Sequence, residues 1–181
     1  MAERQPRAAV NCTDQWDDDA RQPAAKDDVM PWADARERLA AATLYWVATV
    51  RTGSGAPHVR PVFAVWVDGF LCSTTNGARA KARNLAADPH VTFTTHTDDI
   101  DFIVEGTAAP VTDGELRERI VAAYRDKYGW PLSERDGELY APFGAPAAGP
   151  PPYRPYAVTP DVVYGMGTTD ALARRSTRWR F

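Results

Sequence analysis

The stretch "TLYWVATVRTGSGAPHVRPVFAVWVDGFLCSTT", residues 43–75, decides the fold of this chain. Residues 44–51 are dense in aromatic and β-branched types, which favour a strand, and Gly53-Ser54-Gly55 is a hairpin signal. Residues 57–67 carry the same residue types and predict a second strand antiparallel to the first. Pro61 interrupts this second strand, and a central strand rarely keeps a proline. Pro61 therefore indicates an edge, a bulge or a place where the backbone faces a ligand.

The second strand leads to a strand-to-helix junction. Asp68-Gly69 predicts a tight turn before a third strand, "FLCST", at residues 70–74. The helix "ARAKARNLAA", residues 78–87, follows, and Asp88-Pro89 ends it because proline disfavours helical geometry in the residue before it. Three strands and a crossover helix are thus expected in this part of the chain.

The flanking sequence adds further strands and two more helices. The expected elements are a helix over residues 31–42, strands over 90–97 and 100–111, a helix opened by the capping-box spacing Thr112 to Glu115 and ended at Gly129, and a last strand over 156–166. Residues 130–155 are rich in proline and glycine and predict a long loop, for which we expect the role of a lid. Antiparallel strands with short turns predict a small β-barrel flanked by helices.

Length and composition indicate one domain. The chain has 181 residues, 44% of them hydrophobic, which is enough for one sizeable core. Residues 1–29 are polar, charged and aperiodic, and they predict a disordered tail, the alternative being an arm that orders on a neighbouring subunit. We therefore expect a single folded domain over residues 30–181.

Charge and cysteine content exclude several classes of function. The formal net charge is -3, whereas capture of nucleic acid needs a strongly basic face. No apolar run has the roughly 20 residues that a membrane helix needs, and the first residues lack the apolar core of a secretory signal. The two cysteines, Cys12 and Cys72, suit a reducing cytoplasm rather than a disulfide framework. The three histidines show no metal-ligand spacing, so no metal site is expected.

The junction, residues 73–81, carries the chemistry that stands out. The turn Asn76-Gly77 separates three hydroxyl residues from Arg79 and Lys81, which lie at the start of the expected helix. A helix N-terminus attracts anions, and two cations there oppose the helix dipole unless an anion lies between them. The pattern therefore indicates a phosphate site, the alternative being a solvated helix face whose cations contact only water.

Three other features have a simpler structural explanation. His58 is a candidate proton donor, but a solvated strand residue has the same pattern. The acidic run Asp98-Asp99-Asp101 fits a solvated hairpin turn better than a metal site, since no further ligand is near in sequence. Trp130 fits a core residue better than the border of a substrate site.

The stretch "APHVRPVFAVWVDGFLCSTTNGARAKARNLAADPHVTF" resembles the flavin-binding part of the pyridoxamine 5'-phosphate oxidase-like superfamily. The match is closest to the branch that depends on coenzyme F-420, a deazaflavin. Further marks are "IVEGTA", "YRDKYGW" and the terminal "TRWRF", and the resemblance covers Pro31 to Phe181. It implies a mainly β fold, a split β-barrel of six or so antiparallel strands, and a cofactor bound at the interface of a homodimer.

The resemblance also implies a set of cofactor-binding residues. They are Arg60, Pro61 and Val62 beside the ring, Ser73, Thr74 and Thr75 beside the ribityl-phosphate arm, and Arg79 and Lys81 as the cations of the phosphate site. Pyridoxamine phosphate oxidases carry an adjacent Arg-Lys pair here, whereas this chain has Arg-Ala-Lys. The chain also has no equivalent of their substrate-phosphate motif, so oxidation of vitamin B6 is not expected.

The resemblance predicts a cytoplasmic oxidoreductase that transfers a hydride from coenzyme F-420 to a small acceptor with an activated double bond. FMN is the alternative cofactor on the same fold. A protein that binds a cofactor, haem or a small ligand without catalysis is the second alternative. No residue stands out as a dedicated catalytic acid.

Overall fold

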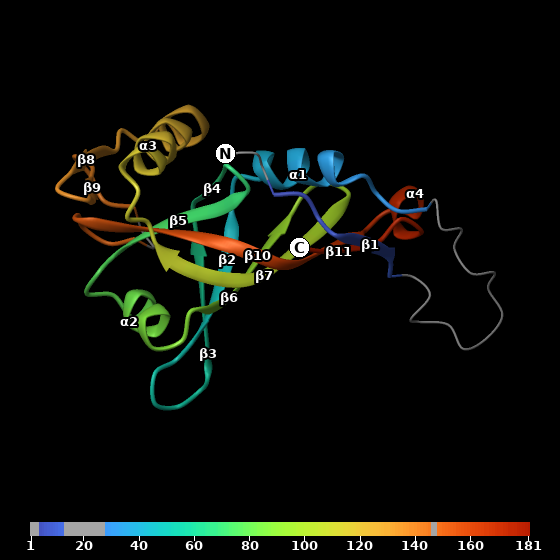
Figure 1. Ribbon diagram of the computed structural model, residues 1–181, viewed down its shortest axis with the longest axis horizontal. Helices are drawn as coiled ribbons and strands as arrows, with labels where there is room; N and C mark the ends of the chain where they lie inside the picture. The colour runs from blue at the N-terminus through green and yellow to red at the C-terminus, as the bar shows by residue number, and fades with distance from the viewer. Residues whose placement is uncertain (1–3, 13–27, 146–147) are drawn as a thin grey trace.

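The computed structural model describes residues 4–12, 28–145 and 148–181. Their strands form one antiparallel sheet that is folded on itself (Figure 1). Its main path runs β1 (Ala8–Asn11), β11 (Thr177–Arg180), β10 (Tyr153–Gly167), β7 (Ile100–Pro110), β6 (His90–His96), β2 (Tyr45–Val50) and β3 (Pro57–Val62). The fold is mainly β and is the expected split β-barrel.

The long strand β10 joins the two halves of the barrel. Residues 153–158 pair with β5 (Phe70–Asn76), residues 162–165 pair with β11, and the register of the pairing with β7 shifts at Asp161. β5 also pairs with β4 (Ala64–Val67) along its other edge. β5 is therefore hydrogen-bonded on both sides, which gives it a fixed place between the two halves.

The expected meander is confirmed with one correction. The strand expected over residues 57–67 is two strands, β3 and β4, with Phe63 between them. β3 pairs with β2 and ends the main path of the sheet, whereas β4 pairs with β5. Because these partners belong to different halves of the barrel, one straight strand cannot reach both. Pro61 lies on the edge strand β3, which is one of the three alternatives expected for it.

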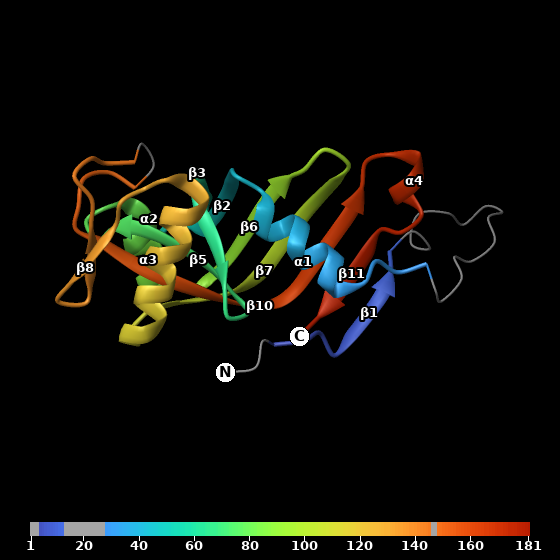
Figure 2. The same ribbon diagram turned by 90° about the horizontal axis from the view of Figure 1, so that it is seen from above.

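Helices cover the sheet on several sides (Figures 1 and 2). They are α1 (Trp32–Ala41), α2 (Ala80–Ala87), α3 (Gly114–Tyr128) and the short α4 (Asp170–Ala173). The N-cap of α3 is Asp113 rather than Thr112, since the Asp113 carboxylate accepts hydrogen bonds from the backbone N–H groups of Glu115 and Leu116. Gly129 ends α3 in the left-handed region, with a φ of 61°, as expected. No helix in the described residues is long and apolar enough to cross a membrane.

Two segments differ from the expectation. Residues 8–11, expected within a disordered tail, form β1 and pair with β11, and backbone bonds from Arg7 and Cys12 extend the pairing. The open edge of β11 offers main-chain partners to any extended segment, a long-range effect that local composition does not report. The expected loop 130–155 contains the hairpin β8 (Ser133–Arg135) and β9 (Glu138–Tyr140), and its end begins β10. Residues 13–27 of the expected tail lie outside the described residues.

Two hydrophobic clusters form the core, one on each side of β5. Leu71 belongs to the larger cluster, with Trp32 of α1, Leu85 of α2 and Trp179 of β11. The next residue, Cys72, belongs to the second cluster, with side chains of α3. Figure 1 shows α2 and α3 on opposite sides of β5. Successive residues of β5 therefore face different helices.

Candidate functional site

The end of β5 carries buried hydroxyl groups without partners. Ser73, Thr74 and Thr75 are all buried, and the Oγ1 atoms of Thr74 and Thr75 form no hydrogen bond with any described residue. A buried polar atom without a partner costs free energy, so native structures keep few of them. Two such hydroxyl groups on successive residues indicate that a ligand can supply the missing hydrogen-bond partners at this strand end.

Lys81 lies in the first turn of α2 and is almost completely buried, with 4% of its surface exposed. Its Nζ forms no hydrogen bond within the described part of the chain. Burial lowers the pKa of Lys81 to about 8, because an ammonium group loses its hydration there and gains no partner. The alternative of a solvated cation is therefore wrong for Lys81.

His58 is buried close to Lys81, on the inner side of the edge strand β3. Its Nδ1 lies 3.5 Å from the Thr49 hydroxyl, which accepts a hydrogen bond from Asn84 Nδ2 of α2 at 3.0 Å. Burial lowers the pKa of His58, and the charges of Arg60, Arg51 and Lys81 lower it further. His58 is thus a buried imidazole and not a solvated strand residue.

Arg79 is the N-cap of α2, and its side chain remains exposed. Its guanidinium lies against the backbone of Gly149, where an added Cβ would come within 2.6 Å of Nε. Gly149 has a φ of +82°, which glycine adopts without strain. The loop before β10 therefore holds the Arg79 side chain on the side of α2 that faces this loop, whereas the Lys81 side chain is buried.

Asn76 connects the loop before β10 to the junction. Its N–H donates to Ala148 O at 3.1 Å, its Nδ2 donates to Pro150 O at 2.9 Å, and its Oδ1 accepts from Ala78 N at 2.8 Å. The asparagine was expected only as part of a turn. It also fixes the loop that contacts Arg79, which only the folded chain reveals.

An apolar cavity of about 240 Å³ lies on the α3 side of β5. It is lined by Leu44, Pro61, Val62, Phe63, Thr74, Tyr124, Trp130, Ala145 and Ala148. Trp130 is buried, as expected for a core residue, and it also borders this cavity. Sequence reasoning found Pro61, Val62 and Thr74 but missed the cavity, because its walls come from segments far apart in the chain.

The structure divides the expected site residues between two sides of β5. Thr74 lines the apolar cavity, so Ser73 and Thr75, which alternate with it along the strand, face the side of Leu71 and α2. Pro61 and Val62 lie at the cavity, whereas Arg60 is exposed and donates to the backbone oxygen of Val59. The α2 side, with Ser73, Thr75 and Lys81, has the donor set that fits a phosphate.

The acidic run has ordinary partners. Asp99 forms an ion pair with Arg38, and Asp101 accepts from His96 Nδ1 at 2.7 Å. No group of side chains suited to hold a metal ion occurs in the residues that the structure describes.

Comparison with known proteins gives the family. Solved structures of similar fold include a conserved hypothetical protein from Mycobacterium tuberculosis, with 20% identity over 81% of this chain and 89% of that one and a TM-score of 0.58. They also include a FAD-binding protein from Mesorhizobium loti, with 14% identity over 84% and 95% of the two chains and a TM-score of 0.55. A pyridoxamine 5'-phosphate oxidase-related, FMN-binding protein from Nostoc punctiforme matches with 20% identity over 83% and 90% and a TM-score of 0.53. No curated protein matches.

The family pattern described as pyridoxamine 5'-phosphate oxidase matches residues 32–166. This range includes β2 to β7, α2, α3 and most of β10, and thus the whole of the junction and the apolar cavity. The chain therefore belongs to the pyridoxamine 5'-phosphate oxidase family.

Proposed function

We propose that this protein is an oxidoreductase that binds the phosphate-bearing arm of coenzyme F-420 at the junction. The observation that carries the proposal is the buried Lys81 ammonium, whose Nζ has no hydrogen-bond partner among the described residues. A buried, unpaired cation is costly, and a bound anion offsets that cost by ion pairing. FMN carries a phosphate on a similar arm and is the alternative cofactor.

The residues near Lys81 complete a site for one anion. Ser73 and Thr75 offer hydroxyl donors from β5, and the N–H groups of the first turn of α2 add the positive end of the helix dipole. Arg79 adds a positive charge from the solvent side. The proposed role of Lys81 is to pair with the phosphate, while the hydroxyl groups orient it.

The chemistry follows from the cofactor class. When bound in its reduced form, the coenzyme supplies a hydride to an activated double bond, and water supplies the proton that completes the addition. The protein's own contribution is to hold the ring beside β3, where Arg60, Pro61 and Val62 remain the proposed contacts. Burial and the charges of Arg60, Arg51 and Lys81 lower the pKa of His58, which favours its neutral form and leaves the positive charge of this region to Lys81 and the arginines.

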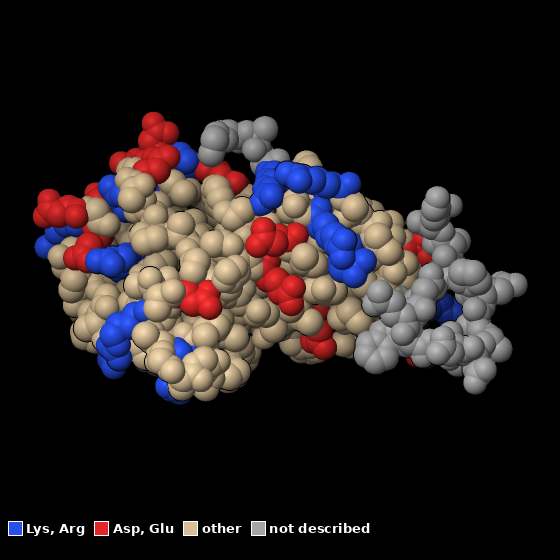
Figure 3. Space-filling view, turned by 60° about the horizontal axis from the view of Figure 1, so that its bottom comes forward, with Lys and Arg blue, Asp and Glu red and all other residues tan. Residues whose placement is uncertain are grey.

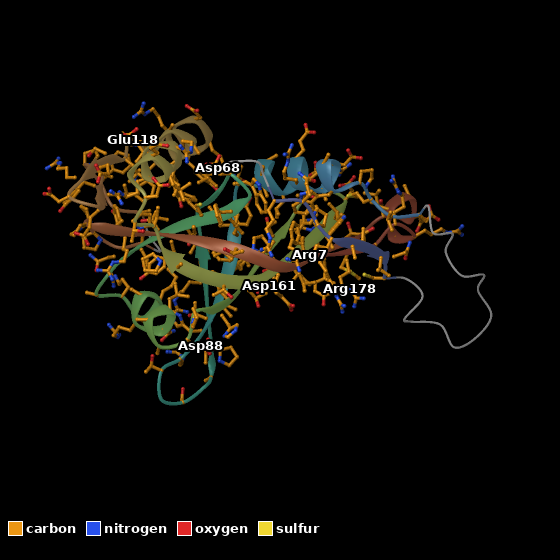
Figure 4. All side chains as sticks on the ribbon, in the orientation of Figure 1. Arg7, Asp68, Asp88, Glu118, Asp161 and Arg178 are labelled. Carbon is orange, nitrogen blue, oxygen red and sulfur yellow. The ribbon has the colours of Figure 1, made fainter. Side chains whose placement is uncertain are left out.

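A second copy of this chain is proposed to cover the outer face of β2 and β3. Trp46 and Val59 are 47% and 45% exposed there, and a hollow of about 440 Å³ on the same face is lined partly by Glu105 and Asp161. Basic and acidic groups lie on the face that Figure 3 shows, and Figure 4 labels Arg7, Arg178 and Asp161 on the part of the sheet where β1, β11 and β10 are neighbours. A twofold axis can bring the acidic groups of one copy against the basic groups of the other.

If this face is the dimer interface, Trp46→Lys should separate the two copies, and light scattering should then measure half the mass.

The cofactor proposal is tested by titrating the protein with coenzyme F-420 and with FMN, with fluorescence as the measure of binding. Lys81→Met should weaken binding of the true cofactor about 10- to 100-fold, the usual range for loss of a charge-assisted contact. Arg83→Met is the matched control, since it removes an exposed cation from the same helix. Equal affinities of wild type and Lys81→Met for both compounds would show that the phosphate does not bind here.

A further inference from the structure

A buried polar network connects β2, β3 and α2. Thr49, His58 and Asn84 are each at most 5% exposed. The Asn84 side chain donates from Nδ2 to Thr49 Oγ1 at 3.0 Å and accepts the Thr52 N–H at Oδ1. Thr49 Oγ1 in turn lies 3.5 Å from His58 Nδ1. The network therefore orients the His58 ring through one of its two nitrogens.

The second ring nitrogen of His58 has no such partner. Nε2 forms no hydrogen bond with any residue of the described ranges 4–12, 28–145 and 148–181. A neutral imidazole whose Nδ1 accepts a hydrogen bond from the Thr49 hydroxyl carries its proton on Nε2. Nε2 is then a donor on a buried side chain, and native structures rarely leave such a donor without an acceptor.

His58 shares a face of β3 with two of the proposed cofactor contacts. Side chains alternate along a strand, so His58, Arg60 and Val62 point to the same side of β3. Val62 lies at the apolar cavity, at one end of this row. His58 lies at the other end, opposite Thr49, which the Asn84 side chain of α2 contacts.

Lys81 lies on the face of α2 that carries Asn84. The two residues are three positions apart and are therefore neighbours on one helix face. Burial lowers the pKa of His58, and nearby positive charges lower it further. These charges belong to Arg60, Arg51 and Lys81. His58 and Lys81 are thus within electrostatic range of each other, one on β3 and one on α2.

The positive charges around His58 favour a neutral ring, because they oppose a further cation. A neutral ring with its proton on Nε2 can donate one hydrogen bond to an anion without adding charge to the site. A ring nitrogen with a lone pair would repel the same anion, so a bound phosphate also selects this tautomer. The charge for the anion comes from Lys81, and His58 supplies direction.

We propose that His58 binds the phosphate of the cofactor as a neutral hydrogen-bond donor through Nε2, and that Thr49 is the positioning residue that holds its ring. This inference rests on the proposed function, since it adds a ligand to the phosphate site of Lys81. It replaces the role of proton donor expected from the sequence, because the His58 ring keeps its proton throughout.

Nuclear magnetic resonance of the imidazole nitrogens tests the proposal on the full-length protein. A two-bond nitrogen–proton spectrum distinguishes the two neutral tautomers from each other and from the imidazolium. On saturation with the cofactor, His58 should give the pattern of a neutral ring protonated at Nε2, and its Nε2 resonance should shift. His90 and His96 are internal controls, since both are exposed and contact Asp88 and Asp101. A His58 proton on Nδ1, or a spectrum that the cofactor leaves unchanged, would contradict the proposal.

Substitutions at His58 separate the hydrogen bond from the bulk of the side chain. His58→Leu should weaken cofactor binding about 5- to 20-fold, the effect of one lost hydrogen bond to a charged group. His58→Gln places an amide N–H near the position of Nε2 and should recover most of this loss. His90→Leu is the matched control, since it removes an exposed histidine. Equal losses in His58→Leu and His58→Gln, or no loss in either, would overturn the proposal.

Thr49→Val tests the positioning role, because it removes the hydroxyl at Nδ1 and keeps the shape of the side chain. Cofactor affinity should fall about 3-fold, and the ligand-free His58 ring should populate both tautomers. Lower affinity with an unchanged ring spectrum would make the role of Thr49 purely structural and refute the positioning role.

Ligands that differ only in the phosphate locate the contact. Riboflavin is FMN without its phosphate, and the deazaflavin with its ribityl chain is the corresponding part of coenzyme F-420. His58→Leu should weaken binding of the cofactor that the wild type binds and leave binding of its phosphate-free counterpart unchanged. An equal loss for both would place His58 at the ring or the ribityl chain, which contradicts the proposal.

The results for Lys81 and His58 separate this inference from the proposed function. A loss in Lys81→Met with none in His58→Leu would refute the inference and leave the proposed function standing. If the wild type binds neither cofactor, the proposed function fails, and a titration with inorganic phosphate tests the inference by itself. A shift of the His58 Nε2 resonance with phosphate would then support an anion site at His58, and an unchanged resonance would refute it.

Discussion

Two lysines in this molecule have the same lowered pKa and opposite surroundings. Burial lowers the pKa of both Lys81 and Lys127 to about 8. Lys127 Nζ, on α3, donates to Ala64 O at 3.0 Å and to the Tyr45 hydroxyl at 3.3 Å, and it lies 4.9 Å from the centre of the Tyr45 ring. Lys81 Nζ, on α2, has no hydrogen bond with a described residue. A lowered pKa alone thus does not distinguish a lysine with a structural role from a lysine that binds a ligand.

The difference lies in the acceptors around each ammonium. Lys127 has a carbonyl, a hydroxyl and two ring faces, which together replace part of its lost hydration. The charge of Lys81 has no such replacement within the described residues. The ammonium of Lys127 therefore has hydrogen-bond partners in the ligand-free protein, whereas the charged form of Lys81 is destabilising there, and a bound anion can offset that cost.

The largest expected effect is that two substitutions change the free energy of unfolding in opposite directions. Lys127→Met should lower the free energy of unfolding by about 2 kcal/mol, because it removes two hydrogen bonds and the contacts with the rings. Lys81→Met should raise it by about 1–2 kcal/mol at pH 7, because it replaces a buried unpaired cation with an apolar side chain of similar length. Urea unfolding without cofactor, at unchanged m-value, measures both. Destabilisation of similar size in both variants would remove the distinction between the two lysines.

The second expected effect is that the stability gained in Lys81→Met shrinks as pH rises. A lysine whose pKa is about 8 in the folded state and about 10.4 in the unfolded state loses its proton first in the folded state. Between these values the unfolded state binds more protons, so wild-type stability rises with pH. The gap between Lys81→Met and wild type should therefore close by about 1–2 kcal/mol between pH 8 and 10. Tyrosines and cysteines titrate in both proteins and cancel in the difference, and a constant gap would contradict the lowered pKa.

The strands and the junction could be predicted from local sequence. Alternating and β-branched residues indicated the meander, and Asn76-Gly77 followed by Arg79 and Lys81 indicated an anion site at a helix start. These patterns depend on residues within a few positions of one another, so composition and spacing report them. The pairing of β2 with β3 and of β4 with β5 follows the same local logic.

The features that distinguish the site come from long-range contacts. The burial of Lys81 depends on the packing of α2 against β2 and β5, and no residue near it in sequence reveals this. The break at Phe63 arises because β3 and β4 pair with different halves of the barrel. The apolar cavity is lined by Leu44, Trp130 and Ala148. More than 80 positions of sequence separate Leu44 from Trp130.

The third expected effect concerns the cofactor. A bound phosphate favours the charged form of Lys81, so binding raises its pKa above the value of about 8 that it has in the ligand-free protein. Cofactor affinity should therefore be constant from about pH 7 to 8 and fall by up to 10-fold per unit at higher pH. Lys81→Met should lose this dependence, whereas Lys127→Met should keep it. A pH profile of the dissociation constant in the three proteins is the measurement, and a profile shared by all three would assign the titration to another group.

The smallest expected effect tests whether burial, rather than charge alone, gives Lys81 its importance. Arg79 belongs to the same junction and carries the same charge, but its side chain is exposed and lies against Gly149. Because solvent screens an exposed cation, Arg79→Met should weaken cofactor binding only about 3- to 5-fold. This loss should disappear at 1 M salt, where screening acts over about 3 Å, while the larger loss in Lys81→Met should persist. If salt removes both losses equally, the phosphate lies in solvent beside both cations, and the buried position of Lys81 contributes nothing to binding.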